Sequence, residues 1–515
     1  MTEPWTEADR ALLRERGISE QEAERQLALL RTPPAPARLE RAATLGDGIE
    51  RLEPLDSADE SERLAAFDEL VRAGRLTRLV PASGAATRMF RDLLEELDEP
   101  REPSPAIERL LGVLPELPFA PQLSAAVDGC GVDLEHARRD LASARRLVRA
   151  LLHGTAERAA AEGAAERDDD HAGLAHLPKG LIPFHRQQAA RGPVLLTPAE
   201  EHAAETRALV GGRARLHFTV APEHETSFAE RLRAFDRTVA VGFSHQLPAT
   251  DTLALTEDGH PLRDESGRLV LRPGGHGALI GNLERAPSDA VAIRNVDNVL
   301  PAHLRAERQA WTRRLVGELA LFERAVHAAL EALLQGRGDE AARRVADRLG
   351  TPCSDRDELV RALDRPLRVC AMVENLGEPG GGPFWVEGSG AHASAHPTLQ
   401  IVESSQVDHD DCRQAEIAKG ATHFNPTDLV CSLRRWDGSR FALDPFVDPG
   451  ASFVTTKSHQ GRSIRALERP GLWNGAMAGW LTRFVELPAS TFAPVKTVWD
   501  LLRPEHQPED ASSGA

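Results

Sequence analysis

The sequence predicts an α/β protein whose sheet is mixed and mainly parallel, with helices on both faces. Short apolar runs with β-type residues recur along the chain, and helical sequence lies between several of them. The first of these runs leads through a small-residue loop into a helix. The length of 515 residues is enough for about two or three packed units.

Residues 1–74 are expected to form a polar helical appendage. Within this segment Ser19 is placed to cap a helix, and Glu22, three residues later, would complete a capping box. A proline-rich break, RTPPAPA, follows. The segment is therefore predicted to stand outside the main sheet.

Residues 75–365 are expected to form the core of the protein. This part opens with the β-type run RLTRLV, and residues 98–176, rich in Ala, Arg and Glu, predict a helical insertion. Residues 302–349 again predict helices. The later strand candidates are LHFTVA, VAVGFS, LVLRPGG and AVAIRN.

Residues 366–502 predict short strands separated by Gly- and Pro-rich loops, with one helical stretch near LWNGAMAGWLTRFVE. We expect this β-rich part to complete an acceptor site. Residues 503–515 are polar and are expected to form a disordered tail.

Composition excludes several classes of protein. The formal charge is −17, from 79 acidic and 62 basic residues, which disfavours nucleic-acid and membrane partners because their phosphates would be repelled. No run approaches the length of a bilayer span, and charges stand where a signal peptide needs an apolar core. The five cysteines form no CxxC pair, which predicts reduced thiols and no zinc cage. The sequence predicts a cytoplasmic protein.

The loop PASGAATRM is the first candidate site. Small residues after a strand let phosphate oxygens approach backbone N–H groups, so Ser83, Gly84 and Ala85 are candidate nucleotide-binding residues. Arg88, predicted one turn into the helix, can bind a phosphate through two N–H groups. The alternative is a tight turn between strand and helix, because neither a Walker motif nor a complete GxGxxG is present.

Two lysines are the next candidates. Lysine supplies only four of the 62 basic residues, so each one is informative. Lys179 lies between two prolines in LPKGLIPF, where the restricted backbone would aim its ammonium group, and Lys496 precedes a predicted helical start in FAPVKTVWDLL. The alternative for both is a solvated surface lysine.

Gln246 in FSHQLPATDT follows an apolar run, and its carboxamide can donate to and accept from the edge of a nucleobase. In RPGGHG, the glycines around His276 allow the backbone to approach a flat ligand, which makes Gly275 and Gly277 candidates as well. A glycine turn with an incidental histidine is the alternative.

Asp297 in NVDN follows the buried-looking run AVAI, at the carboxyl end of a predicted strand, where ligands bind in open α/β sheets. One carboxylate plus substrate phosphates is a usual way to hold Mg²⁺. Asp297 is therefore the candidate metal ligand, with a simple turn-forming role as the alternative.

The order of these motifs resembles the UDP-sugar pyrophosphorylases, a family that includes UDP-glucose pyrophosphorylase and its UDP-N-acetylhexosamine relatives. PASGAATRM is similar to the family's LxGGxGTxxG loop, LPKGLIPF to PKxLLP, and RPGGHG to PPGHGD. FSHQLPA resembles the glutamine motif, IRNVDN the strand ending in VDN, and TFAPVKTVWDLL the RFLPVKTxxDLL motif. GLWNGAMAGWLTRF stands where the family has its ETAMGAAI helix. The resemblance covers about residues 76–502.

The chain as a whole resembles even more the bacterial family "domain of unknown function 4301". The shared blocks are SGAATRMF, RPGGHGALI, EPGGGPFWV and THFNP. This second resemblance implies no activity by itself.

The resemblance to the pyrophosphorylases implies a Rossmann-like nucleotidyltransferase sheet of the GT-A type. It implies an enzyme that joins a nucleoside triphosphate to a sugar 1-phosphate and releases pyrophosphate, with Mg²⁺ as cofactor. Arg88 would hold the departing pyrophosphate, Lys179 would neutralise the nucleotide phosphates, and Lys496 would hold the acceptor phosphate. The residues expected to line the acceptor pocket are Asn298, Glu378, Asn425 and Lys457.

Departures from the family pattern keep two other functions open. The loop reads SGAA where the family has GGxG, Ala278 replaces an acidic residue after GHG, and about 90 residues separate Arg88 from Lys179. The first alternative is nucleotidyl transfer to a phosphate acceptor that is not a sugar. The second is a non-catalytic nucleotide-binding protein of the same fold.

Overall fold

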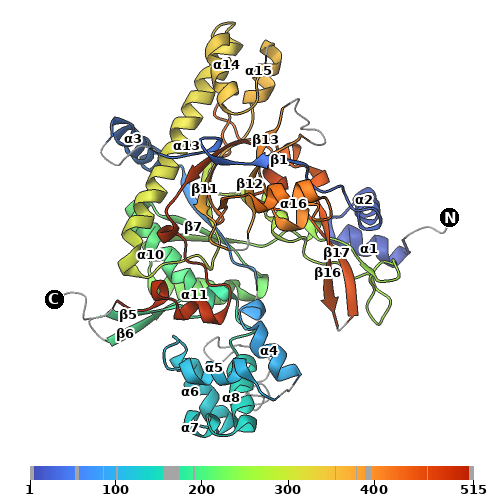
Figure 1. Cartoon of the computed structure of the whole chain (residues 1–515), viewed down its shortest axis with the longest axis vertical. Coiled ribbons are helices and arrows are strands. Elements are labelled where there is room, and N and C mark those ends of the chain that lie inside the picture. Colours follow the sequence, from blue (N-terminus) through green and yellow to red (C-terminus); the bar gives the residue numbers. More distant parts are fainter. Residues whose placement is uncertain are drawn as a thin grey trace. The chain divides into compact units, whose positions relative to one another are not determined.

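The computed structural model divides the chain into two compact units. Unit 1 comprises residues 1–79, 244–294 and 311–489, and unit 2 comprises residues 80–243, 295–310 and 490–515. Figure 1 shows the elements of both units. The structure describes residues 5–52, 57–84, 86–99, 102–154, 173–189, 192–353, 355–377, 380–388, 396–460 and 462–509.

The strands of unit 1 form a large mixed sheet in the order β2-β3-β18-β11-β15-β10-β4. β11 is parallel to β18, β18 to β3 and β10 to β4, whereas β15 is antiparallel to both of its neighbours. The predicted mixed, mostly parallel sheet is thus confirmed. β11 is buried along almost its whole length, as expected for a strand covered on both faces. The bounds are β2 Thr44–Leu45, β3 Gly48–Glu50, β4 Leu76–Pro81, β10 Ala290–Arg294, β11 Leu367–Glu374, β15 Asp428–Ser432 and β18 Leu481–Glu486.

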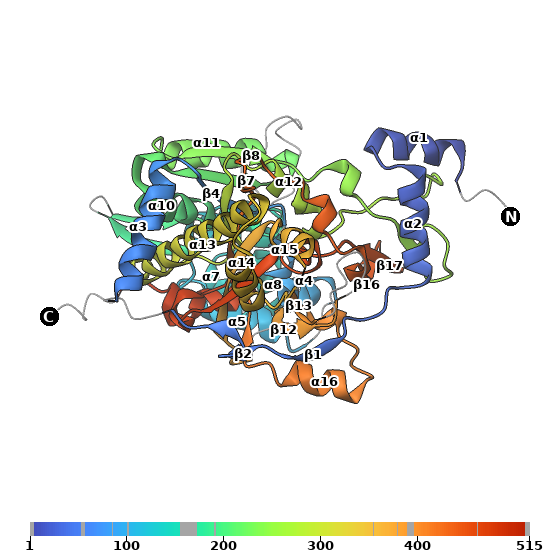
Figure 2. The same cartoon turned by 90° about the horizontal axis from the view of Figure 1, so that it is seen from above.

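Two smaller sheets and several helices complete unit 1. One sheet has the order β1-β12-β13, and the other has the order β16-β17-β9. Helix α2 contacts β17, and these elements lie side by side in Figure 2. The bounds are α1 Glu7–Arg16, α2 Glu20–Arg31, β1 Leu39–Ala42, α3 Ala58–Arg72, β9 Ala254–Thr256, α12 Ile280–Glu284, α14 Asp339–Arg348, α15 Arg356–Leu363, β12 Gly382–Val386, β13 Thr398–Val402, α16 Cys412–Lys419, β14 His423–Phe424, β16 Phe453–His459 and β17 Arg462–Glu468. Helix α13, Arg305–Leu334, begins in unit 2 and continues in unit 1 from residue 311.

Unit 2 holds the last residues of β4, the strands β7 and β8 that follow it in the sheet order, and the hairpin β5-β6. The helices α5, α6 and α7 all contact α8 and form the blue and cyan group in Figure 1. Among the described helices of the chain, none is both long and apolar enough to cross a membrane. The bounds are α4 Arg91–Asp98, α5 Pro105–Val113, α6 Ala120–Cys130, α7 Leu134–Ala137, α8 Leu141–His153, β5 His185–Ala189, β6 Gly192–Leu196, α10 Pro198–Val210, β7 Arg215–Thr219, α11 Glu225–Phe235 and β8 Ala240–Ser244.

Local sequence signals explain several of these boundaries. Thr197 caps α10 through a capping box with Glu200, and Pro198 stands at the first helical position. Ser19 caps α2 as predicted, but Glu22 does not complete the box, because its carboxylate bonds Arg25 instead.

Three of the four later strand candidates in the core form strands, namely β7, β8 and β10. LVLRPGG does not: its backbone makes only isolated bridges, such as the one between Leu269 and Arg263. The helix expected near LWNGAMAGWLTRFVE is also wrong. That stretch forms a 3₁₀ turn at Gly475–Met477 and then strand β18, because pairing with β11 outweighs local helical spacing.

The divisions expected from the sequence differ from the observed units. Residues 1–74 are more than an appendage, because β1 pairs with β12 and β3 pairs with β18. The segment expected to be a disordered tail contains a 3₁₀ turn at Pro504–His506, in which the His506 side chain is buried. Residues 510–515 of that segment, and residues 155–172 of the expected helical insertion, lie outside the described residues.

Gly180 provides a test of the packing in unit 2. A Cβ at Gly180 would lie 2.7 Å from the buried ring of Phe228. We expect Gly180→Ala to lower the free energy of unfolding by about 1–3 kcal/mol, since the new Cβ would also lie 3.0 Å from Val296 and both neighbours are buried. Thermal and urea unfolding measure the loss. Gly212→Ala is the matched control, because a Cβ there meets nothing within 4 Å, and equal losses in the two variants would contradict the prediction.

Candidate functional site

The small-residue loop and the first lysine segment lie against each other in unit 2. The backbone N–H of Ala86 donates to the carbonyl of Leu177 at 3.3 Å, and the N–H of Lys179 donates to the carbonyl of Gly84 at 3.5 Å. The chain between these segments contains the helices α4 to α8. Two motifs that are far apart in the sequence are therefore neighbours in space.

The C-terminal segment joins the same place. The backbone N–H of Val495 donates to the carbonyl of Asp297 at 3.1 Å, and the N–H of Val498 donates to the carbonyl of Met89 at 3.0 Å. All four segments belong to unit 2. The segments that carry PASGAATRM, LPKGLIPF, NVDN and FAPVKTVWDLL therefore meet in one site.

The centre of this site is a carboxylate between two ammonium groups. The Lys179 ammonium donates to Asp297 Oδ2 at 3.2 Å and to the carbonyl of Val495 at 2.9 Å. The Lys496 ammonium lies 3.3 Å from Asp297 Oδ1 and 3.1 Å from Oδ2. The side chain of Lys179 is only 12% exposed, whereas that of Lys496 is 50% exposed. Lys179 is thus enclosed, and Lys496 remains open to solvent.

Burial and neighbouring charges shift the pKa values of Asp297 and Lys179. Burial raises the pKa of Asp297, but the ammonium groups of Lys496 and Lys179 outweigh burial and hold this pKa below its usual value. Burial lowers the pKa of Lys179, and the neighbouring Lys496 lowers it further, against the attraction of Asp297. Asp297 is therefore an ionised carboxylate at neutral pH.

Asp500 orients the segment that carries Lys496. Its Oδ2 accepts from the backbone N–H of Lys496 at 2.8 Å and from the N–H of Thr497 at 2.7 Å. Thr497 and Asp500 form a capping box at the start of a 3₁₀ turn, Val498–Leu502. The sequence analysis missed Asp500, although the spacing TxxD is itself a capping signal.

Asn298, expected to bind the acceptor, is buried beside Asp297. Its Oδ1 accepts from an Arg308 N–H at 2.9 Å and from the backbone N–H of Ala493 at 3.2 Å, and its backbone carbonyl accepts from Arg308 at 3.0 Å. Its buried Nδ2 has no partner among the described residues. The oxygen of this carboxamide is therefore used within the protein, and its nitrogen is buried and not presented at the surface.

A buried network of polar side chains holds His506, near the end of unit 2, against His185. His185 Nδ1 lies 2.7 Å from Glu201, its Nε2 lies 2.9 Å from His506 Nδ1, and Arg305 also donates to Glu201. Burial holds the pKa of His185 well below its usual value and lowers the pKa of His506 to about 4. Both imidazoles are therefore neutral at pH 7. No local sequence pattern marks these residues.

Three of the candidate residues in the small-residue loop, Ser83, Gly84 and Arg88, face solvent. Ser83 and Gly84 are exposed, and a Cβ at Gly84 would meet nothing within 4 Å. Arg88 is exposed at the end of a 3₁₀ turn, Ala86–Arg88, which precedes α4, so it does not lie one turn into an α-helix. Ala85 lies outside the described residues.

The glycines of RPGGHG, in unit 1, pack against their own chain. A Cβ at Gly277 would lie 2.1 Å from the carbonyl oxygen of Pro470. Gly275 has a φ of +74° and lies against the carboxylate of Glu468. These glycines are required by the fold itself, so their presence alone does not indicate a ligand.

His276 is held on both ring nitrogens. Its Nδ1 accepts from the backbone N–H of Leu472 at 3.1 Å, which assigns the proton to Nε2, 3.2 Å from Glu403. The ring stacks on Trp473, with centroids 4.1 Å apart. Gln246, also in unit 1, is half-buried, and its Nε2 has no partner among the described residues.

The acceptor candidates Asn425 and Lys457 lie in unit 1 and make internal contacts. Asn425 donates to the carbonyl of Ala371 at 2.9 Å and accepts from the N–H of Thr427 at 3.1 Å, so both ends of its carboxamide are used. Lys457 pairs with Glu468 across β16 and β17. Glu378 lies outside the described residues.

A metal ion at this site would depend on its ligand for most of its donors. Among the described residues, no group of three or more His, Cys, Asp or Glu side chains could hold a metal. Asp297 is an ionised carboxylate beside the small-residue loop, and Mg²⁺ is commonly held by one or two carboxylates plus substrate phosphates. The residues present therefore fit a Mg²⁺ that arrives with a phosphate ligand.

The protein is thus a mixed α/β protein with a large, mostly parallel sheet and a site of two lysines and an aspartate. Within this class, the chain belongs to the family described as "Domain of unknown function (DUF4301)", which it matches over residues 6–507. This confirms the resemblance read from the sequence blocks. No curated protein matches the sequence.

Several solved structures are similar to the chain. UDP-glucose pyrophosphorylase from Leishmania major is 14% identical with a TM-score of 0.42, and the match covers 96% of this chain and 77% of that one. UDP-N-acetylglucosamine pyrophosphorylase from Trypanosoma brucei is 13% identical with a TM-score of 0.46, covering 97% and 79%. A UDP-glucose phosphorylase from Trypanosoma brucei is 14% identical with a TM-score of 0.44, covering 97% and 80%.

The unequal burial of the two lysines predicts unequal effects on stability. Asp297→Asn leaves the buried Lys179 ammonium without its counter-charge, so we expect a loss of about 3 kcal/mol in the free energy of unfolding. Lys496→Ala removes a half-exposed partner and should cost at most about 1 kcal/mol. Urea unfolding at pH 7 compares the variants. A loss in Lys496→Ala as large as that in Asp297→Asn would contradict this ranking.

The buried histidines predict a loss of stability in mild acid. The pKa of His506 is about 4 in the folded protein, below its unfolded value of about 6.5. Between these values the unfolded chain binds a proton that the folded protein does not, so stability falls by about 1.4 kcal/mol per pH unit as the pH decreases. His185 acts in the same direction. Urea midpoints from pH 7.5 to 4.5 should fall less steeply in His506→Asn, and an unchanged slope would refute this origin.

Proposed function

We propose that the protein is a nucleotidyltransferase that joins a nucleoside triphosphate to a sugar 1-phosphate and releases pyrophosphate. The observation that carries the proposal is the convergence of Lys179 and Lys496 on Asp297, beside the small-residue loop. The segments involved follow one another in the order that resembles the UDP-sugar pyrophosphorylases. Two cations beside exposed backbone suit a ligand with several phosphates.

The reaction needs alignment and charge neutralisation more than a protein nucleophile. An oxygen of the sugar 1-phosphate forms a bond to the α-phosphorus. The bond from that phosphorus to the oxygen bridging to the β-phosphorus breaks, and pyrophosphate leaves with the electron pair. Arg88 and Lys179 would neutralise the nucleotide phosphates, and Lys496 would hold the acceptor phosphate.

The two lysines would divide this work according to their burial. Lys179 stays fixed by Asp297 and by the carbonyl of Val495. Lys496 is half-exposed, so an incoming phosphate can reach its ammonium while Lys179 still balances Asp297. The exposed backbone at Gly84 leaves room for a phosphate to approach its N–H.

Mg²⁺ fits this proposal at Asp297. Together with phosphate oxygens, this carboxylate would hold the ion, which neutralises phosphate charge when bound. Gln246, Gly275, His276 and Gly277 would face the base and ribose of the nucleotide, as the motif resemblance implies.

The test is pyrophosphate release by the purified protein with Mg²⁺, each common nucleoside triphosphate and a panel of sugar 1-phosphates. We expect release to require one nucleotide and one acceptor. Lys496→Ala should lower kcat/KM by about 10²- to 10³-fold, because it removes a cation from the reacting phosphates. Lys419→Ala is the matched control, an exposed-face lysine of α16 in unit 1, and should leave the rate unchanged.

Gly84→Ala separates an effect on nucleotide binding from an effect on folding. The added Cβ meets no protein atom, so thermal stability should be unchanged while nucleotide affinity falls. If pyrophosphate is released only with a phosphate acceptor that is not a sugar, the proposed acceptor, a sugar 1-phosphate, is wrong. Nucleotide binding without release across the whole panel would overturn the enzymatic proposal in favour of a non-catalytic nucleotide-binding protein.

A further inference from the structure

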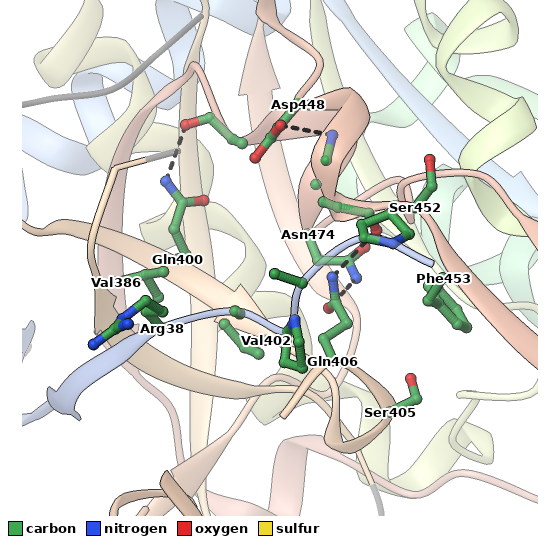
Figure 3. Close-up of a pocket in the computed structure, with 18 of the residues that line it drawn as sticks. Arg38, Val386, Gln400, Val402, Ser405, Gln406, Asp448, Ser452, Phe453 and Asn474 are labelled. Carbon is green, nitrogen blue, oxygen red and sulfur yellow. Dashed lines mark hydrogen bonds between the residues drawn. The ribbon is translucent and has the colours of Figure 1, made fainter. Parts of the chain in front are cut away.

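Unit 1 contains a cavity of about 450 Å³, which is within the usual range for small-molecule sites. Figure 3 shows its walls. They are formed by residues 33–38, the end of β12, the strand β13 with the turn after it, residues 448–454 and residues 474–478. None of these residues belongs to the site of Lys179, Asp297 and Lys496, so the cavity is a separate feature.

The charges around this cavity disfavour an anionic ligand. Among the described residues that line it, only Arg38, Glu387 and Asp448 are charged. Arg38 and Glu387 pair with each other at 3.2 Å, and both are exposed, with 76% and 51% of their side chains accessible. Asp448 is buried, and its Oδ1 accepts from the N–H of Gly450 at 2.9 Å. No unpaired cation is therefore offered to a phosphate by these lining residues.

The interior is instead polar and uncharged, and its side chains are held in place. Gln400 donates to the carbonyl of Ala478 at 2.9 Å. Asn474 donates to Gln406 Oε1 at 2.7 Å, and Gln406 donates to the carbonyl of Ala451 at 3.4 Å. Figure 3 draws the bond between Asn474 and Gln406 as a dashed line. The carboxamides are thus oriented before a ligand arrives, which reduces the entropy lost on binding.

The opposite wall is apolar and rigid. It is formed by the segment TPPAPAR, in which prolines fix the backbone, and it is tied down where the N–H of Ala37 donates to the carbonyl of Gln406 at 2.8 Å. The half-buried ring of Phe453 adds an aromatic surface. Apolar and aromatic surfaces of this kind suit the C–H faces of a sugar ring.

We infer that this cavity binds a neutral carbohydrate of the size of a mono- or disaccharide. Hydroxyl groups both donate and accept, which matches Ser405, Ser452 and the carboxamide of Asn474, whose oxygen has no partner among the described residues. The ring faces match Phe453 and the prolines. Ser405 and Gln406 belong to the segment ESSQVD, residues 403–408. Because the described lining residues offer no unpaired cation, the saccharide is an uncharged one.

Binding of glucose, N-acetylglucosamine and maltose to the full chain tests the inference, by saturation-transfer NMR and calorimetry. We expect at least one of them to bind, and both Phe453→Ala and Ser405→Trp to weaken that binding at least tenfold. Ser405 is exposed, so its variant fills the mouth of the cavity without disturbing the fold. Trp436→Ala, which removes an exposed aromatic ring elsewhere in unit 1, is the matched control. Binding of none of the three saccharides, or binding that both cavity variants leave unchanged, would overturn the inference.

The corresponding sugar 1-phosphates test the charge of the ligand. Because the described lining residues offer no unpaired cation, we expect the phosphate to add no affinity. A phosphate that strengthens binding would contradict a neutral ligand. Because binding is measured without turnover, saccharide binding in a protein that releases no pyrophosphate supports the cavity and contradicts only the proposed function.

Discussion

The carboxylate of Asp297 between two ammonium groups is the interaction on which the architecture of unit 2 depends. Withdrawing a charge from water costs several kcal/mol, so a buried charge persists only where partners are built around it. Lys179 and Lys496 reach Asp297 from opposite directions in the sequence, and the carbonyl of Val495 completes the bonds of Lys179. This requirement fixes the course of the small-residue loop, the LPKG turn and the C-terminal segment together, because any other register would leave a buried charge alone.

The surroundings of this ion pair are hydrogen-bonded and buried on one side and exposed to solvent on the other. Arg308 grips Asn298 through both its backbone carbonyl and its side chain, and the imidazoles of His185 and His506 pack with rings nearly parallel. On the open side, half of the Lys496 side chain meets solvent. The ammonium group of Lys496 is thus open to an anion, while the contacts of Asn298 and His185 are already formed. Charges held in place in this way are the condition for preorganised electrostatic binding.

Features determined by local pattern could be predicted from the sequence, and those determined by distant partners could not. β4 and β10 follow from apolar runs, and Asp297 follows from its place after one of them. The stretch at residues 475–486 has helix-like spacing, yet its second half forms strand β18 because it pairs with β11. His506 looked like part of a polar tail, and only folding shows that its ring meets His185. The glycines of RPGGHG were expected to allow a close approach of the backbone, and the groups that approach Gly275 and Gly277 within the protein are Glu468 and Pro470.

The position of Lys496 and His506 along the chain has a consequence for biosynthesis. The partners of both residues, at positions 179, 185 and 297, leave the ribosome long before they do. Until residue 506 has emerged, the carboxylate of Asp297 lacks its second cation and the imidazole of His185 lacks its stacked neighbour. The stretch that carries Lys496 and His506 therefore completes contacts whose other partners are synthesised much earlier.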